Sequence, residues 1–103
     1  MERIEKLRSF LQASPHDPFL KHALALELMK LGDEAAARGL LEELLTHDPA
    51  YTGSYYHLAK LLERTGERAL AIEWYEKGLA ACQAAKDQHA YNELRAAYEE
   101  LVD

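Results

Sequence analysis

The sequence predicts an all-α fold of about six helices, and three observations support this prediction. Apolar residues recur at helical spacing along most of the chain, as at Ile4, Leu7, Phe10 and Leu11. Strand signals are absent, because Val occurs once, Ile twice, and no segment alternates apolar with polar residues. Short breaks that contain Pro, Gly or Asp divide the chain into segments of helical length.

The breaks place the helices in order. Ser14 and Pro15 end the first helix, and Asp17 can cap the second, in which Pro18 takes the first helical position. Gly32 can end that helix in the left-handed conformation, and Asp33 can cap the third. Three further breaks follow, at 46–49, 65–67 and 86–87. We therefore expect helices over 2–14, 18–31, 34–47, 52–65, 68–85 and 88–102, with neighbours packed antiparallel because every connection is short.

The chain also repeats itself. Gly32 and Gly66 lie 34 residues apart, and Leu24, Ala25 and Ala37 fall on Leu58, Ala59 and Ala71 at the same offset. A period of 34 residues with two helices per unit is typical of a helical repeat architecture.

These residues resemble the tetratricopeptide repeat family, whose pattern can be followed along the chain. The first unit carries it at Lys21, Leu24, Ala25, Leu28, Ala37, Leu41 and Pro49, and the second at Tyr55, Leu58, Ala59, Leu62, Ala71 and Tyr75. Gln83 replaces the terminal proline of the second unit, so we expect its second helix to extend further. The resemblance implies one domain, a right-handed stack of antiparallel helical hairpins, divided into an N-terminal capping helix (1–17), two repeats (18–51 and 52–85) and a C-terminal capping helix (86–103).

The resemblance also implies a function. In this family the first helix of each unit lines a concave groove that receives a peptide or helix of a partner protein. The positions that match are Phe19, His22, Leu26, Met29, Tyr56, Lys60 and Glu63. The Lys and Asn residues with which some members hold a C-terminal carboxylate are not matched, so we expect no acidic tail as ligand. The alternative is that the terminal helices cover these side chains.

Aromatic residues near the second repeat have two interpretations. Tyr and Trp often dominate binding energies, but aromatics at helical spacing are mostly core residues. We expect Tyr55, Trp74 and Tyr75 to pack between helices, and Tyr56 to be available for a groove contact.

Two other functions remain open. One is a self-assembling homodimer that pairs through the stripe Tyr91, Leu94, Tyr98 and Leu101. The other, more remote, is a metal-binding protein built on His22, His57 and Glu63, although no H-x3-H or H-E-x-x-H spacing occurs.

Composition excludes several classes of function. Twelve basic against eighteen acidic residues give a net charge of −6, which disfavours nucleic acid and anionic membranes as partners. Cys82 is the one cysteine, and charged residues occupy the start of the chain where a signal peptide has an apolar core, so we expect a cytoplasmic protein. No catalytic constellation or cofactor motif is recognisable, and the sequence predicts a non-enzymatic protein without a cofactor or metal.

Overall fold

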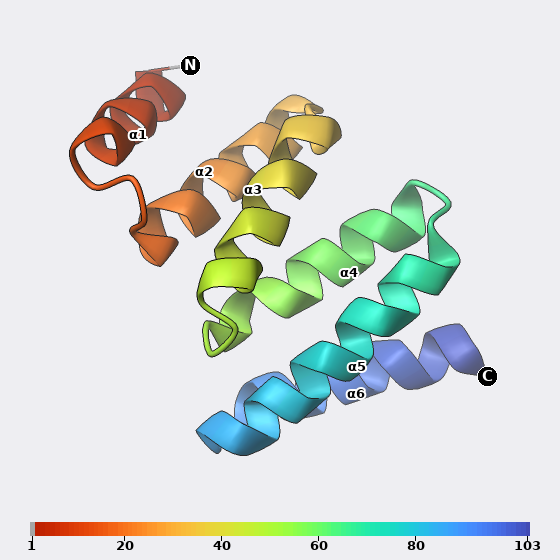
Figure 1. Cartoon of the computed structure of the whole chain (residues 1–103). Helices are drawn as coiled ribbons and strands as arrows, with labels where there is room; N and C mark the ends of the chain where they lie inside the picture. Colours follow the sequence, from red (N-terminus) through yellow and green to blue (C-terminus); the bar gives the residue numbers. More distant parts are fainter. Residues whose placement is uncertain (1) are drawn as a thin grey trace. The chain divides into compact units, whose positions relative to one another are not determined.

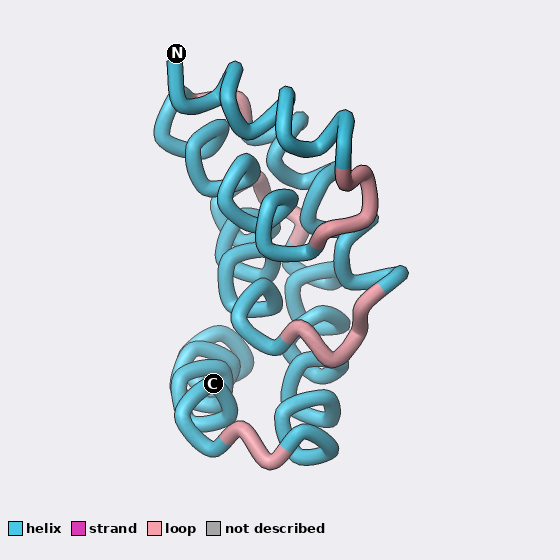
Figure 2. Tube along the Cα trace, turned by 90° about the vertical axis from the view of Figure 1, so that its left-hand side faces the viewer, coloured by secondary structure: helices cyan, strands magenta, loops and turns pink. Residues whose placement is uncertain are grey.

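The computed structural model describes residues 2–103 and confirms the all-α fold. Figure 1 shows the elements, which Figure 2 draws as helices joined by short loops, with no strand among the described residues. They are α1 (Glu2–Ala13), α2 (Pro18–Leu31), α3 (Glu34–His47), the short 3-10 helix η1 (Thr52–Ser54), α4 (Tyr55–Arg64), α5 (Arg68–Ala85) and α6 (Gln88–Val102).

The predicted helix ends agree closely with the structure. The bounds of α2, α3, α5 and α6 are those expected, and α1 ends one residue early. The segment expected as one helix over 52–65 differs, because it begins with η1 and continues as α4 to Arg64. Helix α5 has 18 residues against 14 in α3, as the replacement of proline by Gln83 predicted.

Local hydrogen bonds explain these ends. The Asp17 carboxylate accepts from the backbone N–H groups of Phe19 and Leu20 at 3.0 and 3.3 Å and so caps α2. Asp33 and Asp87 cap α3 and α6 in the same way. Gly32 lies in the left-handed region with φ of 91°, where a Cβ would be strained, and its N–H satisfies carbonyls at the end of α2.

The chain forms two compact units, the first ending at Asp48 and the second beginning at Pro49. In the first unit, α2 and α3 form a hairpin and α1 packs against α2. Ile4 and Leu7 bury one side of α1, but Phe10, expected on the same apolar face, is 56% exposed. The core of this unit is completed by Ala23, Leu24, Ala25, Leu28, Ala37, Leu41, Leu44 and Leu45.

In the second unit, α5 lies between α4 and α6 and packs against both. Hydrogen bonds tie the ends of these helices together, since Thr52 donates to Asp87 at 2.6 Å and Arg68 donates to the Leu101 carbonyl at 3.1 Å. The core consists of Tyr55, Leu58, Ala59, Leu61, Leu62, Ala71, Tyr75, Cys82, Ala90, Leu94 and Ala97.

Gly78 lies where α5 packs closely against both α4 and α6. A Cβ at this position would lie 2.7 Å from the Tyr55 Cβ on α4 and 2.9 Å from the Leu94 Cδ1 on α6. Only glycine allows both neighbours to pack this closely on α5. Gly39, in the middle of α3, is exposed and has nothing within 4 Å of such a Cβ.

A buried lysine distinguishes the first unit. Lys21, at the position that Tyr55 holds in the second repeat, has a side chain that is 3% exposed, and its Nζ lies 2.8 Å from the Glu43 Oε1 on α3. This contact lowers the pKa of Glu43, first through the hydrogen bond from Lys21 and then through the attraction of its charge. The pair therefore replaces an apolar core contact with an ionic one.

We expect opposite effects from the same substitution at the two helical glycines. Gly39→Ala should stabilise the protein by about 0.5–1 kcal/mol, because alanine favours a helix interior and meets no neighbour. Gly78→Ala should destabilise it, because overpacking costs about 1–3 kcal/mol and exceeds the gain in helix propensity. Thermal unfolding of both variants checks this, and a higher melting temperature for Gly78→Ala would contradict the close packing of α4, α5 and α6.

The Lys21–Glu43 pair should contribute stability that depends on pH. The folded-state pKa of Glu43 is lowered, so its contribution is present above the unfolded value of about 4.3 and is lost as pH falls through the folded value. Glu43→Gln should destabilise the protein at pH 7 and reduce its sensitivity to acid. The loss should stay below the ~3–5 kcal/mol of fully buried pairs, since the carboxylate is half exposed.

Denaturant unfolding at pH 7 and pH 3 measures this difference. Lys21→Met serves as the matched control, because it keeps the length of the side chain and removes the charge that needs a partner. It should be neutral or stabilising at pH 7. A variant Glu43→Gln with the stability of the parent at pH 7 would show that the pair contributes nothing.

Candidate functional site

The first helix of each hairpin carries one row of half-buried side chains. Both rows have the spacing i, i+4, i+7, which places their members on one face of a helix. The rows are His22, Leu26 and Met29 on α2, and Tyr56, Lys60 and Glu63 on α4, and they coincide at the 34-residue offset. Six of the seven predicted groove residues thus occupy equivalent places in the two units, and Phe19 lies one turn before the α2 row.

The row on α2 is mainly apolar. Phe19 is 62% exposed, and Leu26 and Met29 are half-buried. Other apolar residues of α2, such as Ala23 and Leu28, are buried, and α2 packs against α1 and α3. Apolar side chains therefore also occur on a face of α2 that is not fully buried. They can offer contact area to an apolar segment but no reactive group.

The row on α4 is polar, and Lys60 and Glu63 already have partners within the unit. The Lys60 Nζ lies 3.6 Å from the Glu63 Oε2, and the same carboxylate accepts a short hydrogen bond from the Tyr75 hydroxyl on α5. Burial, followed by this hydrogen bond, raises the pKa of Tyr75. Glu63 is therefore held in place by one contact from its own helix and one from α5.

Tyr56 lies beside a half-buried histidine, His57. Its ring stacks on that of His57, with centroids 5.8 Å apart and an interplanar angle of 18°. The pKa of His57 is lowered, mainly because burial disfavours the charged ring; Glu93 on α6 opposes this shift and Arg64 adds to it. A neutral imidazole thus supports Tyr56 at the edge of the row.

The aromatic residues of the second repeat pack largely as predicted. Tyr55 and Tyr75 are buried, and Tyr75 meets Tyr98 edge to face with centroids 6.2 Å apart. The Tyr55 hydroxyl donates to the Pro49 carbonyl at 2.6 Å. Trp74 is half-buried against Tyr55, and the Lys77 ammonium lies 4.6 Å from its ring centre. These rings therefore stabilise the helix pairs, whereas Tyr56 keeps part of its surface exposed.

The other predicted site residues have less support. No group of three or more His, Cys, Asp or Glu side chains in residues 2–103 is arranged to hold a metal. The stripe proposed for a homodimer is not wholly available, since Leu94 is 1% exposed and the Tyr98 hydroxyl donates to Glu76 at 2.7 Å.

Cys82 is buried in α5, and burial raises the pKa of its thiol. None of the helices in the described part of the chain is long and apolar enough to cross a membrane.

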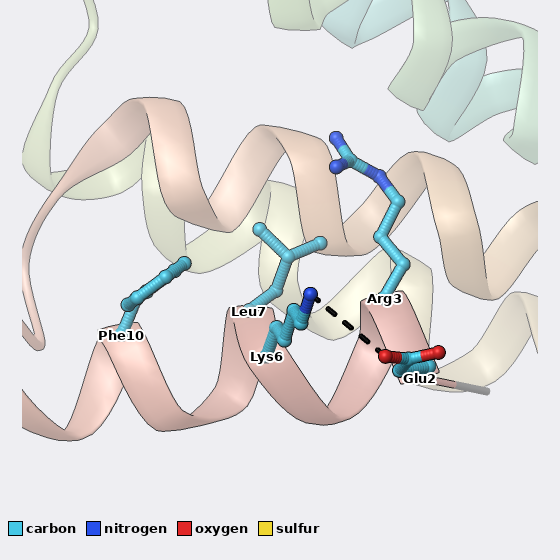
Figure 3. Close-up of a pocket in the computed structure, with 5 residues that line it drawn as sticks. All are labelled: Glu2, Arg3, Lys6, Leu7 and Phe10. Carbon is cyan, nitrogen blue, oxygen red and sulfur yellow. Dashed lines mark ion pairs between the residues drawn. The ribbon is translucent and has the colours of Figure 1, made fainter.

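A hollow on α1 was not predicted from the sequence. Its lining consists of Glu2, Arg3, Lys6, Leu7 and Phe10, which Figure 3 shows along one side of the helix. The sequence did contain an indication of this difference. At the 34-residue offset, Arg3 occupies the position at which the second helix of each repeat has a buried alanine, Ala37 or Ala71.

Solved structures support the fold and the repeat. A tetratricopeptide repeat domain protein from Salinibacter ruber is 39% identical, with a TM-score of 0.80 over 84% of this chain and 88% of that one. A protein from Bordetella parapertussis is 30% identical, with a TM-score of 0.81 over 96% of this chain and 86% of that one.

Curated proteins agree, although no family model matches the chain. A TPR repeat-containing protein from Pseudomonas aeruginosa is 28% identical over 88% of this chain and 87% of its own length. The mouse interferon-induced protein with tetratricopeptide repeats 3 is 25% identical over 97% of this chain, which spans only 24% of that protein.

The environment of His57 predicts an unusual titration. His57 should titrate below the ordinary value of about 6.5, and Glu93→Gln should lower its pKa further by removing the opposing charge. Since the folded-state pKa is lowered, protonation of His57 opposes folding, and stability should fall as pH decreases from about 6.5 through the folded value. Titration of the ring protons by NMR measures both effects, and a rise in the His57 pKa in Glu93→Gln would refute the assignment.

Proposed function

Because the chain belongs to the tetratricopeptide repeat family, we propose that it is a non-catalytic adaptor that binds a peptide or helix of another protein along α2 and α4. Proteins of this family generally mediate protein–protein interactions and are generally non-catalytic scaffolds. The proposed contact residues are the two rows and Phe19.

The apolar face of α2 carries this proposal. Apolar residues of this helix such as Ala23, Leu24 and Leu28 are buried, yet Phe19 is 62% exposed and Leu26 and Met29 are half-buried. Exposed apolar side chains become informative when they gather on one element, because such patches mark interaction sites. An apolar or amphipathic segment is the ligand that this face fits.

The row on α4 adds polar contacts and an aromatic ring. Tyr56 offers the amphipathic surface that recurs in binding hot spots. Lys60 and Glu63 neutralise each other across 3.6 Å. Lys60 would donate hydrogen bonds to a partner and Glu63 would accept them, and the pair would not favour a strongly acidic segment. A cytoplasmic location is part of the proposal, and the single buried cysteine supports it because it suits a reducing compartment.

We expect Leu26→Glu to abolish partner binding. The substitution places a charge in the middle of the apolar row, where a bound segment would have to bury it without a partner. The measurement is affinity capture from the source organism with the parent protein, followed by determination of the dissociation constant of the captured protein for parent and variant. A loss of about tenfold or more is expected.

Leu31→Glu is the matched control. It makes the same chemical change on the same helix, at an apolar residue that is 55% exposed but lies on the side away from the row. This variant should bind as the parent does, and circular dichroism should show unchanged helicity for both. Equal binding by Leu26→Glu and the parent would exclude α2 as the binding face.

A further inference from the structure

Two histidines meet at one end of the first hairpin. The sequence His-Asp-Pro occurs twice, at 16–18, where it leads into α2, and at 47–49, where it follows the end of α3. Because α2 and α3 run antiparallel, the start of one helix and the end of the other lie at the same end of the hairpin (Figure 1). The rings of His16 and His47 are both exposed, and their centres are 5.8 Å apart with the ring planes tilted by 36°.

His47 is held in one tautomer. Its Nδ1 lies 2.9 Å from the carbonyl oxygen of Glu43, one turn earlier on α3. Since a carbonyl oxygen only accepts hydrogen bonds, Nδ1 carries the proton, and Nε2 of the neutral ring keeps its lone pair. Histidines that bind metals are commonly fixed in this way, with one nitrogen donating to a carbonyl and the other bound to the ion. Within residues 2–103, no hydrogen bond occupies the ring nitrogens of His16.

The distance between the two rings fits two ligands of one ion. Imidazole nitrogens bind Zn²⁺ at about 2.0–2.1 Å, which places the centres of two rings on the same ion about 5–6 Å apart. The backbone on both sides is also fixed. The Asp17 N–H donates to the Ser14 carbonyl at 3.2 Å in the turn before α2, and the Asp48 N–H donates to the Leu44 carbonyl at 2.7 Å at the end of α3. The rings therefore need little rearrangement to share an ion.

The surroundings of the pair favour a cation. His47 lies in the last turn of α3, and the C-terminal end of a helix carries a partial negative charge. The half-exposed carboxylate of Glu43 adds a full charge. The pKa of this carboxylate is lowered first by Lys21 and then by the charges of His47 and His16. Glu43 is thus close enough to attract positive charge at either ring.

We propose that His16 and His47 form a binding site for one divalent transition-metal ion, with a nitrogen from each imidazole and water molecules as the remaining ligands. Imidazole suits the late first-row ions, of which Cu²⁺ binds most tightly, ahead of Ni²⁺ and Zn²⁺. With two protein ligands, the site is smaller than a group of three or more, of which the described residues have none. A bound ion joins the turn before α2 to the end of α3.

Isothermal titration calorimetry with Ni²⁺ tests the proposal on the whole chain, prepared without a polyhistidine tag. The parent should bind one ion per chain. His16→Gln and His47→Gln should each bind Ni²⁺ at least about tenfold more weakly, because two linked ligands hold an ion far better than either alone. For the same reason, the loss in either single variant should be nearly as large as the loss in the double variant.

His89→Gln is the matched control, since it removes an exposed histidine from the first turn of α6. It should bind Ni²⁺ as the parent does, and circular dichroism should show that all variants are folded. Mg²⁺, which prefers oxygen ligands, should bind to none of the proteins at the same concentrations. Parent affinity in His16→Gln or His47→Gln, an equal loss in His89→Gln, or one ion per two chains would overturn the proposal.

Two further measurements locate the ion. Cu²⁺ added well below one equivalent should broaden the NMR signals of the His16 and His47 ring protons before those of the other three histidines. Zn²⁺ should raise the melting temperature of the parent but not of either single variant, because an ion that binds only the folded chain stabilises it. Simultaneous broadening of all five histidines, or an equal rise in melting temperature in His16→Gln, would show separate weak binding and overturn the shared site.

Discussion

Each hairpin depends on a close approach of two helices, which small side chains at the contact make possible. Ala25 and Ala37 are fully buried in the first hairpin, and Ala59 and Ala71 in the second. Helices pack about 8–10 Å apart, at a distance set by the side chains between them. Once these alanines fix which sides of the two helices meet, the orientation of every other residue follows from the helical period. The rows on α2 and α4 remain outside the hairpin contact for this reason.

The two repeats share one backbone pattern but carry different side chains at equivalent positions. Lys21 and Tyr55 occupy the same position, and each buries its stem while its polar end finds a partner, Glu43 in one unit and the Pro49 carbonyl in the other. The rows diverge more, since Leu26 coincides with Lys60 and Met29 with Glu63. The fold constrains the buried positions to fit a shared geometry, whereas the exposed positions are free to differ. The two rows therefore differ at positions that the shared packing does not fix.

The features that could be predicted from the sequence are those that neighbouring residues or the repeat determine. The helix ends follow from caps such as Asp17 and Gly32, whose hydrogen bonds reach only a few residues along the chain. The buried alanines follow from the repeat. The exposure of Phe10 did not follow, because the apolar stripe of a helix is buried only where a neighbouring helix covers it. The bond from Tyr75 to Glu63 was also missed, since it joins residues 12 positions apart on different helices.

If the rows bind a partner as proposed, their half-burial should reduce the entropy that binding costs. A side chain such as Leu26, already packed on one side, loses less conformational entropy when a partner covers it than a fully exposed side chain would. The carboxylate of Glu63 is likewise held by Tyr75 and Lys60 before any ligand arrives. The apolar row on α2 can then supply most of the affinity by excluding water. On this proposal, the ordered polar groups on α4 would restrict which segment binds, because a partner that left them unpaired would remove their hydrogen bonds to water without replacement.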